Sequence, residues 1–142
     1  MVSGRTPKEA AAIAALLREM ATHNRETMME PWRERLAESE GLRREMERVV
    51  ANLAVFFNKW TVEIIIVLGQ YGTMRFSELR VNLSGISSRT LTQRLRDLEE
   101  QGLVKRKMYD EMPVRVEYSL TRKGLDVAAL ALPLVLYLGG EG

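Results

Sequence analysis

The chain has 142 residues, a formal net charge of +2 and no cysteine. This length suffices for one domain with its own hydrophobic core, and the lack of cysteine excludes a disulfide framework, a thiolate nucleophile, a thiol redox switch and a Cys-ligated zinc site. The N-terminus lacks the apolar stretch of a signal peptide, and no apolar run reaches the roughly 18 residues of a membrane span. We therefore expect a cytoplasmic protein that has no membrane partner.

The charges are distributed unevenly along the chain. Residues 75–123 hold eleven Lys and Arg residues against seven Asp and Glu residues, whereas nine basic and nine acidic residues cancel within residues 1–57. A local excess of basic residues is typical of a segment that contacts nucleic acid. The C-terminal half is therefore the region in which we look for a functional surface.

Residues 1–57 are predicted to form an N-terminal helical extension that takes part in dimerisation. Its first helix spans about residues 7–28, because Thr6-Pro7-Lys8-Glu9 combines a capping box with proline at the first helical position. Pro31 and the polar residues 39–41 are expected to end this helix. A second amphipathic helix follows from about residue 42 to residue 57, with a solvated face of alternating Arg and Glu residues.

Two further helices are predicted after the extension. Apolar residues from Trp60 to Leu68 recur with helical spacing, and this helix is expected to end near residues 69–72. Residues 74–76 are extended in character. Ser77 is the expected N-cap of a short helix that continues to Leu83.

The best-defined helix of the sequence spans Ser87 to Gln101. Ser87 is its predicted N-cap, and Gly102 is placed to take the left-handed conformation after its last turn. Leu91, Leu95 and Leu98 form one apolar stripe, and Arg89, Gln93 and Arg96 fall on the opposite face. Two short helices joined by a tight glycine-containing turn are typical of a helix-turn-helix.

A β-hairpin and an apolar helix complete the chain. Residues 103–110 and 114–121 each alternate apolar with polar side chains, which predicts two antiparallel strands whose tip projects as a wing. Thr121 is the expected cap of a last helix, which is apolar from Val127 to Leu138. A helix that is apolar all round must be covered on all sides, so we expect a two-fold dimer, with packing within the monomer as the alternative. The residues predicted at its interface are Leu130, Leu132, Leu134 and Leu136, with Ile13 and Leu17 from the N-terminal extension.

Residues from Lys59 to about Leu130 resemble the HxlR-type winged helix-turn-helix regulators of bacteria and archaea. The resemblance rests on Lys59-Trp60-Thr61, on residues 72–79 with the sequence GTMRFSEL, on Gly85-Ile86-Ser87, on residues 91–95 with Leu98-Glu99, and on Gly102-Leu103-Val104, Pro113, residues 115–121 and Gly124. The chain departs from the family pattern at Asn58, Ser84 and Val114. The cysteine through which some family members sense oxidants is also missing, so that mechanism is not carried over.

The resemblance implies a fold that is mainly α with a small β-hairpin wing, an α+β winged helix-turn-helix with dimerisation helices at both ends. The predicted domains are an N-terminal extension at 1–57, a DNA-binding domain at 58–121 and a C-terminal dimerisation helix at 122–142. The resemblance also implies a homodimeric, sequence-specific regulator of transcription that binds double-stranded DNA. The helix 87–101 would lie in the major groove, and the wing 103–121 on the backbone or in the minor groove.

The resemblance and the helical geometry together predict the residues that contact DNA. Arg89, Gln93 and Arg96 are predicted to read bases, since arginine pairs with guanine and glutamine with adenine. The predicted backbone contacts are Arg75, Ser88, Thr92, Lys105, Arg106, Lys107 and Arg115. For Arg96, an ion pair with Glu100 one turn later is an equal alternative.

Enzymatic functions find little support in the sequence. His23 is the only histidine, and there is neither a glycine-rich phosphate loop nor a metal-ligand spacing. No enzyme activity, catalytic residue, metal or cofactor is therefore predicted. Two alternatives stay open: a winged-helix module for protein interaction, and a nonspecific DNA-binding protein. The operator, the regulated genes, the direction of regulation and any small-molecule effector are not indicated by the sequence.

Overall fold

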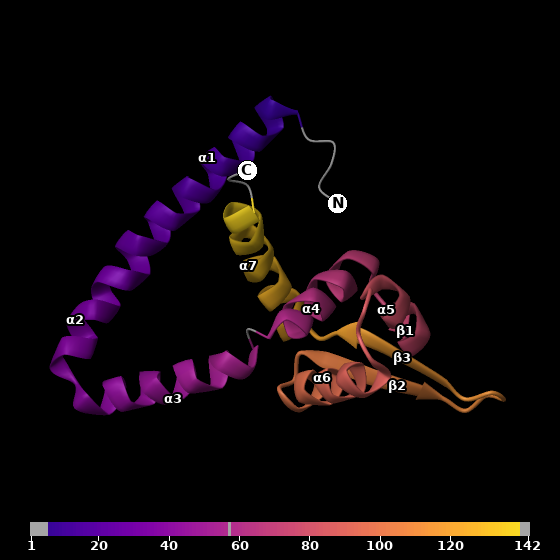
Figure 1. Cartoon of the computed structure of the whole chain (residues 1–142). Coiled ribbons are helices and arrows are strands. Elements are labelled where there is room, and N and C mark those ends of the chain that lie inside the picture. The colour runs from indigo at the N-terminus through magenta and orange to yellow at the C-terminus, as the bar shows by residue number, and fades with distance from the viewer. Residues whose placement is uncertain (1–5, 57, 140–142) are drawn as a thin grey trace. The chain divides into compact units, whose positions relative to one another are not determined.

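The fold is taken from a computed structural model, which describes residues 6–56 and 58–139. Its elements in chain order are α1 (Pro7–Asn24), the π-helix η1 (Arg25–Met29), α2 (Glu30–Glu38), α3 (Glu40–Phe56), α4 (Lys59–Tyr71), β1 (Met74–Arg75), α5 (Phe76–Asn82), α6 (Ser88–Glu100), β2 (Val104–Tyr109), β3 (Arg115–Leu120) and α7 (Arg122–Gly139). All of them except η1 are labelled in Figure 1. The predicted class, mainly α with a β-hairpin wing, is confirmed. The described residues divide into two compact units, 6–53 with 133–139 and 54–132.

The first N-terminal helix begins as predicted but does not end as predicted. Thr6 Oγ1 accepts a hydrogen bond from the Glu9 N–H at 3.2 Å, and Glu9 Oε2 accepts one from the Thr6 N–H at 2.8 Å. The predicted break at Pro31 is wrong, because the chain continues through η1 into α2 and turns only at Ser39 (Figure 1). A widened π turn brings Pro31 into the first turn of α2, where a helix needs no N–H from that residue.

Ser39 separates α2 from α3. Its backbone is extended, and its Oγ accepts a hydrogen bond from the Leu42 N–H at 3.2 Å, which caps α3. The helix therefore begins at Glu40, slightly earlier than the sequence predicted. Within the described residues, α1, η1 and α2 bury no side chain completely.

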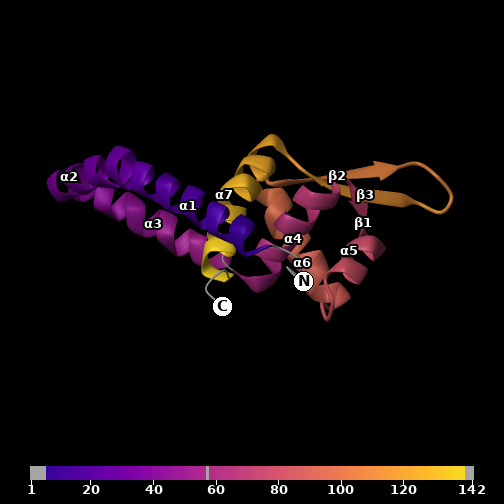
Figure 2. The ribbon, with the colours of Figure 1, turned by 90° about the horizontal axis from the view of Figure 1, so that it is seen from above.

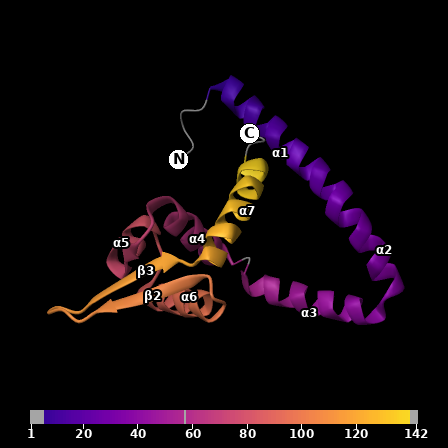
Figure 3. The same ribbon diagram turned by 180° about the vertical axis from the view of Figure 1, so that it is seen from behind.

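The unit of residues 54–132 has a core of buried apolar side chains. Figures 2 and 3 show the helices and strands of this unit from two further sides. Helix α4 is capped by Asn58, whose Oδ1 accepts a hydrogen bond from the Trp60 N–H at 3.1 Å. The core is built from apolar side chains of the three helices and the sheet: Ile64, Ile65, Leu68, Met74, Leu79, Leu83, Ile86, Leu91, Leu95, Leu98, Leu103, Val104 and Leu120. Each of these side chains is buried, so this unit needs no further partner to cover its interior.

The sheet has the order β1-β3-β2, and all its pairs are antiparallel. The sequence predicted the hairpin of β2 and β3 and an extended segment at residues 74–76, but not the pairing of Met74 with Tyr118 that adds β1 as a third strand. This pairing also changes the start of α5. The predicted N-cap, Ser77, is wrong, because the extended residue Arg75 directly precedes the helix and Glu78 Oε2 accepts its N–H at 2.7 Å.

The end of α6 and the start of α7 are joined by hydrogen bonds between residues at the two ends of the hairpin. Gly102 has φ of 72°, and the N–H groups of Gly102 and Leu103 donate to Glu99 O and Leu98 O at 3.0 and 2.9 Å, which is a Schellman motif. The Thr121 hydroxyl donates to Gly102 O at 2.6 Å and accepts from the Gly124 N–H at 3.0 Å. Thr121 therefore caps α7, as predicted, and also connects this helix to the end of α6.

Helix α7 runs from Arg122 through Pro133 to Gly139. Its large apolar side chains are exposed at several positions: Leu125, Leu130, Leu132, Leu134, Val135, Tyr137 and Leu138. Within the described residues, no helix is both long and apolar enough to pass through a bilayer.

Candidate nucleic-acid interface

Helix α6 is held by its ends and by its apolar stripe, so its outer face has a defined orientation. Ser87 Oγ accepts a hydrogen bond from the Thr90 N–H at 3.1 Å, as an N-cap does. Leu91, Leu95 and Leu98 are at most 1% exposed. The predicted cap and the predicted buried stripe are both confirmed.

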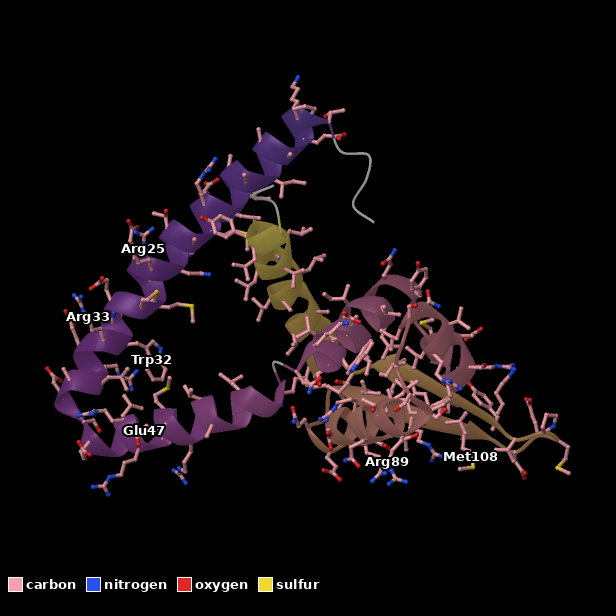
Figure 4. All side chains as sticks on the ribbon, in the orientation of Figure 1. Arg25, Trp32, Arg33, Glu47, Arg89 and Met108 are labelled. Carbon is pink, nitrogen blue, oxygen red and sulfur yellow. The ribbon has the colours of Figure 1, made fainter. Side chains whose placement is uncertain are left out.

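The outer face of α6 consists of Arg89, Gln93 and Arg96, all of which are exposed. Figure 4 shows Arg89 projecting from the helix into solvent. Among the residues that the structure describes, neither Arg89 nor Arg96 makes an ion pair, so the alternative pairing of Arg96 with Glu100 is not found. Both guanidinium groups are available for a ligand.

Gln93 is the one member of this face with an intramolecular side-chain partner. Its Nε2 donates to Asp97 Oδ1 at 2.9 Å, and Arg94 Nη1 donates to Asp97 Oδ2 at 3.0 Å. Asp97 thus uses one carboxylate oxygen for each neighbour. Sequence reasoning missed Asp97, although the spacing of four residues between Gln93 and Asp97 is a known stabilising pair on a helix.

The two hydroxyl groups predicted to bind phosphates differ in whether they can donate a hydrogen bond to a ligand. Ser88 is the first residue of α6 and is exposed, close to the positive end of the helix dipole. Thr92 is half-buried, and its hydroxyl donates to Ser88 O at 2.8 Å. Ser88 can therefore donate to an anion directly, whereas Thr92 would first have to give up this bond.

A groove of about 340 Å³ lies between the outer side of α6 and the sheet. It is lined by Thr92, Leu95, Arg96 and Glu99 from α6, Arg106 from β2 and Tyr118 from β3. Arg106 and Tyr118 are directly paired across the two strands and so share one face of the sheet. The groove brings Arg96 and Arg106 together, which the sequence predicted as separate contacts from helix and strand.

The two lysines of β2 lie on the face of the strand opposite Arg106, as the alternation of side chains along a strand predicted. Lys105 is exposed and pairs with Ser119 in β3. Lys107 Nζ lies 4.8 Å from the centroid of the Tyr109 ring, a cation–π contact. The three adjacent basic residues therefore serve two sides of the wing.

Near the tip of the wing, neighbouring acidic side chains offset the positive charge. Arg115 is 27% exposed and forms ion pairs with Glu111 at 3.4 Å and Glu117 at 3.5 Å. Its guanidinium carbon also lies 3.9 Å from the centroid of the Tyr109 ring. Two carboxylates and an aromatic ring thus surround the charge of Arg115.

Arg75, the last predicted backbone contact, lies in β1 opposite Glu117 of β3 and is exposed. Strand β1 is the edge of the sheet opposite β2, and Arg75 is not among the residues that line the groove beside α6. His23, in α1, belongs to no cluster that could hold a metal: the described residues contain no group of three or more His, Asp or Glu side chains of this kind.

Comparisons with known proteins agree with this geometry. The model of the family described as HxlR-like helix-turn-helix matches residues 55–137. An uncharacterized HTH-type transcriptional regulator of Halalkalibacterium halodurans is 41% identical over 83 residues, which cover 58% of this chain and 70% of the relative.

Solved structures give the same result. A transcriptional regulator of the MarR family from Porphyromonas gingivalis W83 has a TM-score of 0.59 and 36% identity, covering 66% of this chain and 90% of its own. The regulator ytfH of Salmonella typhimurium has a TM-score of 0.57 and 37% identity, covering 65% and 80% respectively. The reduced transcriptional regulator YodB of B. subtilis has a TM-score of 0.54 and 29% identity, covering 63% and 87%.

Proposed function

The chain belongs to the HxlR-like helix-turn-helix family, and we propose that it regulates transcription as a homodimer that binds a specific sequence of double-stranded DNA. The observation that carries this proposal is the outer face of α6. Three polar side chains, Arg89, Gln93 and Arg96, are exposed on a helix that is capped at both ends and anchored by three buried leucines.

The size of α6 suits the major groove. Its 13 residues give a length of about 20 Å at 1.5 Å per residue, and B-DNA accepts a helix in a groove about 12 Å wide. Arg89 would donate to the O6 and N7 atoms of guanine, and Gln93 would pair with adenine. Arg96 is the third proposed base contact, at the edge of the groove that it shares with Arg106.

Backbone contacts would surround this reading helix. Ser88 at the helix N-terminus, Thr92 and Arg106 would bind phosphates near the helix. Lys105, Lys107 and Arg75 would bind phosphates farther along the duplex. Arg115 is the weakest of the proposed contacts, since Glu111 and Glu117 already offset its charge.

The homodimer is supported by the apolar side chains that α7 leaves exposed. Leu130 is 72% exposed, Leu132 44% and Leu134 49%. Leu136 is half-buried, as are Ile13 and Leu17 of α1. A second copy would remove this apolar surface from water and place a second reading helix on the same duplex.

The signal that controls the protein is a separate question. Relatives of known structure include the redox regulator HypR, which was solved in reduced and oxidized forms. This chain has no cysteine, so a thiol switch cannot operate in it. An effector of the protein, where one exists, acts by other chemistry.

Selection from a pool of random duplexes, followed by footprinting of the selected sequence, tests this function. We expect protection of two half-sites about 34 Å apart, or a multiple of that distance. With about six to eight neutralised phosphates, the logarithm of the binding constant should fall with the logarithm of the salt concentration at a slope near −6.

The controls separate the proposed function from its two alternatives. Arg89→Ala should weaken binding to the selected duplex by about tenfold or more, whereas Arg18→Ala, on α1, should leave it unchanged. Binding that does not depend on sequence would indicate a nonspecific DNA-binding protein. A salt slope near zero would contradict DNA binding altogether and favour a module for protein interaction.

A further inference from the structure

We propose that Asp97 sets the base preference of Gln93: it positions the Gln93 amide so that this residue presents one N–H and one carbonyl oxygen to a single base. The inference rests on the proposed function, because it requires that Gln93 reads a base. Asp97 would not touch DNA itself. It is a positioning residue that acts through its neighbour.

The first step of the argument is the orientation of the amide. A carboxylate only accepts hydrogen bonds, so the atom of Gln93 that lies 2.9 Å from Asp97 Oδ1 must be the nitrogen. This contact removes the ambiguity between the two ends of the amide. The carbonyl oxygen is thereby turned away from Asp97, and the amide cannot flip without placing two oxygens against each other.

The second step concerns the hydrogen-bonding groups of Gln93 that remain available to a ligand. The amide nitrogen carries two hydrogens, of which Asp97 takes one. One N–H and the carbonyl oxygen are left for a ligand. In the major groove, adenine presents one acceptor, N7, next to one donor, the N6 amino group, and so matches this remaining pair.

The third step is the fixed position of Asp97 itself. Its second oxygen accepts from Arg94 Nη1 at 3.0 Å, and the side chains of both residues are only 24% exposed. The Nε of Arg94 is buried without a hydrogen-bond partner in the described part of the chain, so the Asp97 carboxylate compensates a partly buried guanidinium. Arg94 in turn offsets a negative charge that would otherwise face the phosphates of DNA.

The experiment measures base preference rather than affinity alone. The probe is the duplex selected by the full wild-type chain, together with its variants at the base pair whose preference Gln93→Ala abolishes. The readout is the ratio of the binding constants for the preferred and the substituted base pair. A partly unfolded variant lowers both constants by the same factor, so this ratio is independent of folding.

Asp97→Ala should reduce the ratio by about tenfold, which is the order of discrimination that one two-point contact supplies. In the Gln93→Ala background it should cause no further reduction. Glu100→Ala is the matched control: it removes one negative charge from the same helix without touching Gln93, and should leave the ratio unchanged. Should Asp97→Ala not fold, Arg94→Leu/Asp97→Ala removes the buried guanidinium as well and is expected to show the same reduction.

Two results would overturn the inference. If Asp97→Ala keeps the ratio within twofold of the wild type while Gln93→Ala abolishes it, the positioning role fails and the proposed function stands. If Gln93→Ala leaves every base preference unchanged, base reading by Gln93 fails, and the role of Asp97 fails with it.

Discussion

The two compact units of this protein bury their apolar side chains to very different degrees. In residues 54–132, Ile64, Leu79 and Leu91 are completely buried. In α1, η1 and α2, among the described residues, no side chain is buried, and Met28, Met29 and Leu16 are more than half exposed. Both segments have helical periodicity and capped helices, so local sequence signals do not explain the difference.

The difference lies in what covers the apolar side chains: those in the core of residues 54–132 cover one another, whereas large apolar side chains of the N-terminal helices stay exposed. Most of the stability of helices in proteins comes from packing of an apolar face. The helix-turn-helix unit supplies that packing internally. The N-terminal helices and the end of α7 would obtain it from the second copy that we propose.

The largest effect is expected inside the helix-turn-helix unit. Leu95→Ala, at a side chain that is 1% exposed, should lower the free energy of unfolding by about 3 kcal/mol, because it removes buried methyl groups and leaves a cavity. Val50→Ala, in α3 and 56% exposed, should change it by less than about 0.5 kcal/mol. Urea unfolding at one fixed protein concentration measures both, and similar losses in the two variants would contradict the contrast between the units.

The next effect concerns the surface that α7 leaves uncovered. Leu130→Glu should weaken the proposed dimer by at least about tenfold, because a charge would be placed in an apolar interface. Val81→Glu is the control, since Val81 in α5 is 81% exposed and lies outside the predicted interface. Sedimentation across a range of concentrations distinguishes the variants. A wild-type chain that sediments as a monomer at micromolar concentration would refute the dimer.

A smaller effect is expected from the N-caps of the two units. Ser87 and Ser39 each accept a hydrogen bond from a backbone N–H, at 3.1 and 3.2 Å. Ser87→Ala should destabilise the cooperative unfolding transition by about 1 kcal/mol. Ser39→Ala should instead increase hydrogen exchange in α3 and leave that transition unchanged. If both substitutions destabilised the same unfolding transition, the expected contrast between the two units would be contradicted.

The smallest effect is expected at the outer part of the wing. Arg115→Ala should weaken binding to the selected duplex by no more than about twofold, because two carboxylates already offset its charge. Arg106→Ala, which removes a cation from the groove beside α6, should cost more and should lower the salt slope by about 1. Mobility shifts at several salt concentrations give both values, and equal losses would show that Arg115 contacts phosphate after all.

The sequence was most informative where structure depends on neighbours along the chain. The start of α6 at Ser88, the conformation of Gly102 and the buried leucine stripe were all predictable, since caps and helical periodicity act over at most two turns. The capping box at Thr6 was predictable for the same reason. The prediction at Pro31 failed because the π turn before it is not encoded by a recognisable local signal.

The candidate site was predictable only in part. Helical periodicity placed Arg89, Gln93 and Arg96 on one face, and strand alternation separated Lys105 from Arg106. Neither pattern could show that Arg96 and Arg106 line one groove, because this depends on how β2 packs against α6. Asp97 lay within reach of sequence reasoning, but its bond to Gln93 competes with solvent and with other rotamers until the helix is in place.

The sequence by itself determined helix α6: its ends, its buried side and the residues on its outer face follow from interactions within one helix. The tertiary structure decided which strands pair with which, as in the contact of Met74 with Tyr118, and which helix lies against the sheet. It also decided the burial, because both units contain amphipathic helices and only the packing determines which apolar side chains are covered. Pairing and packing join residues that are distant in the chain, so no local pattern specifies them.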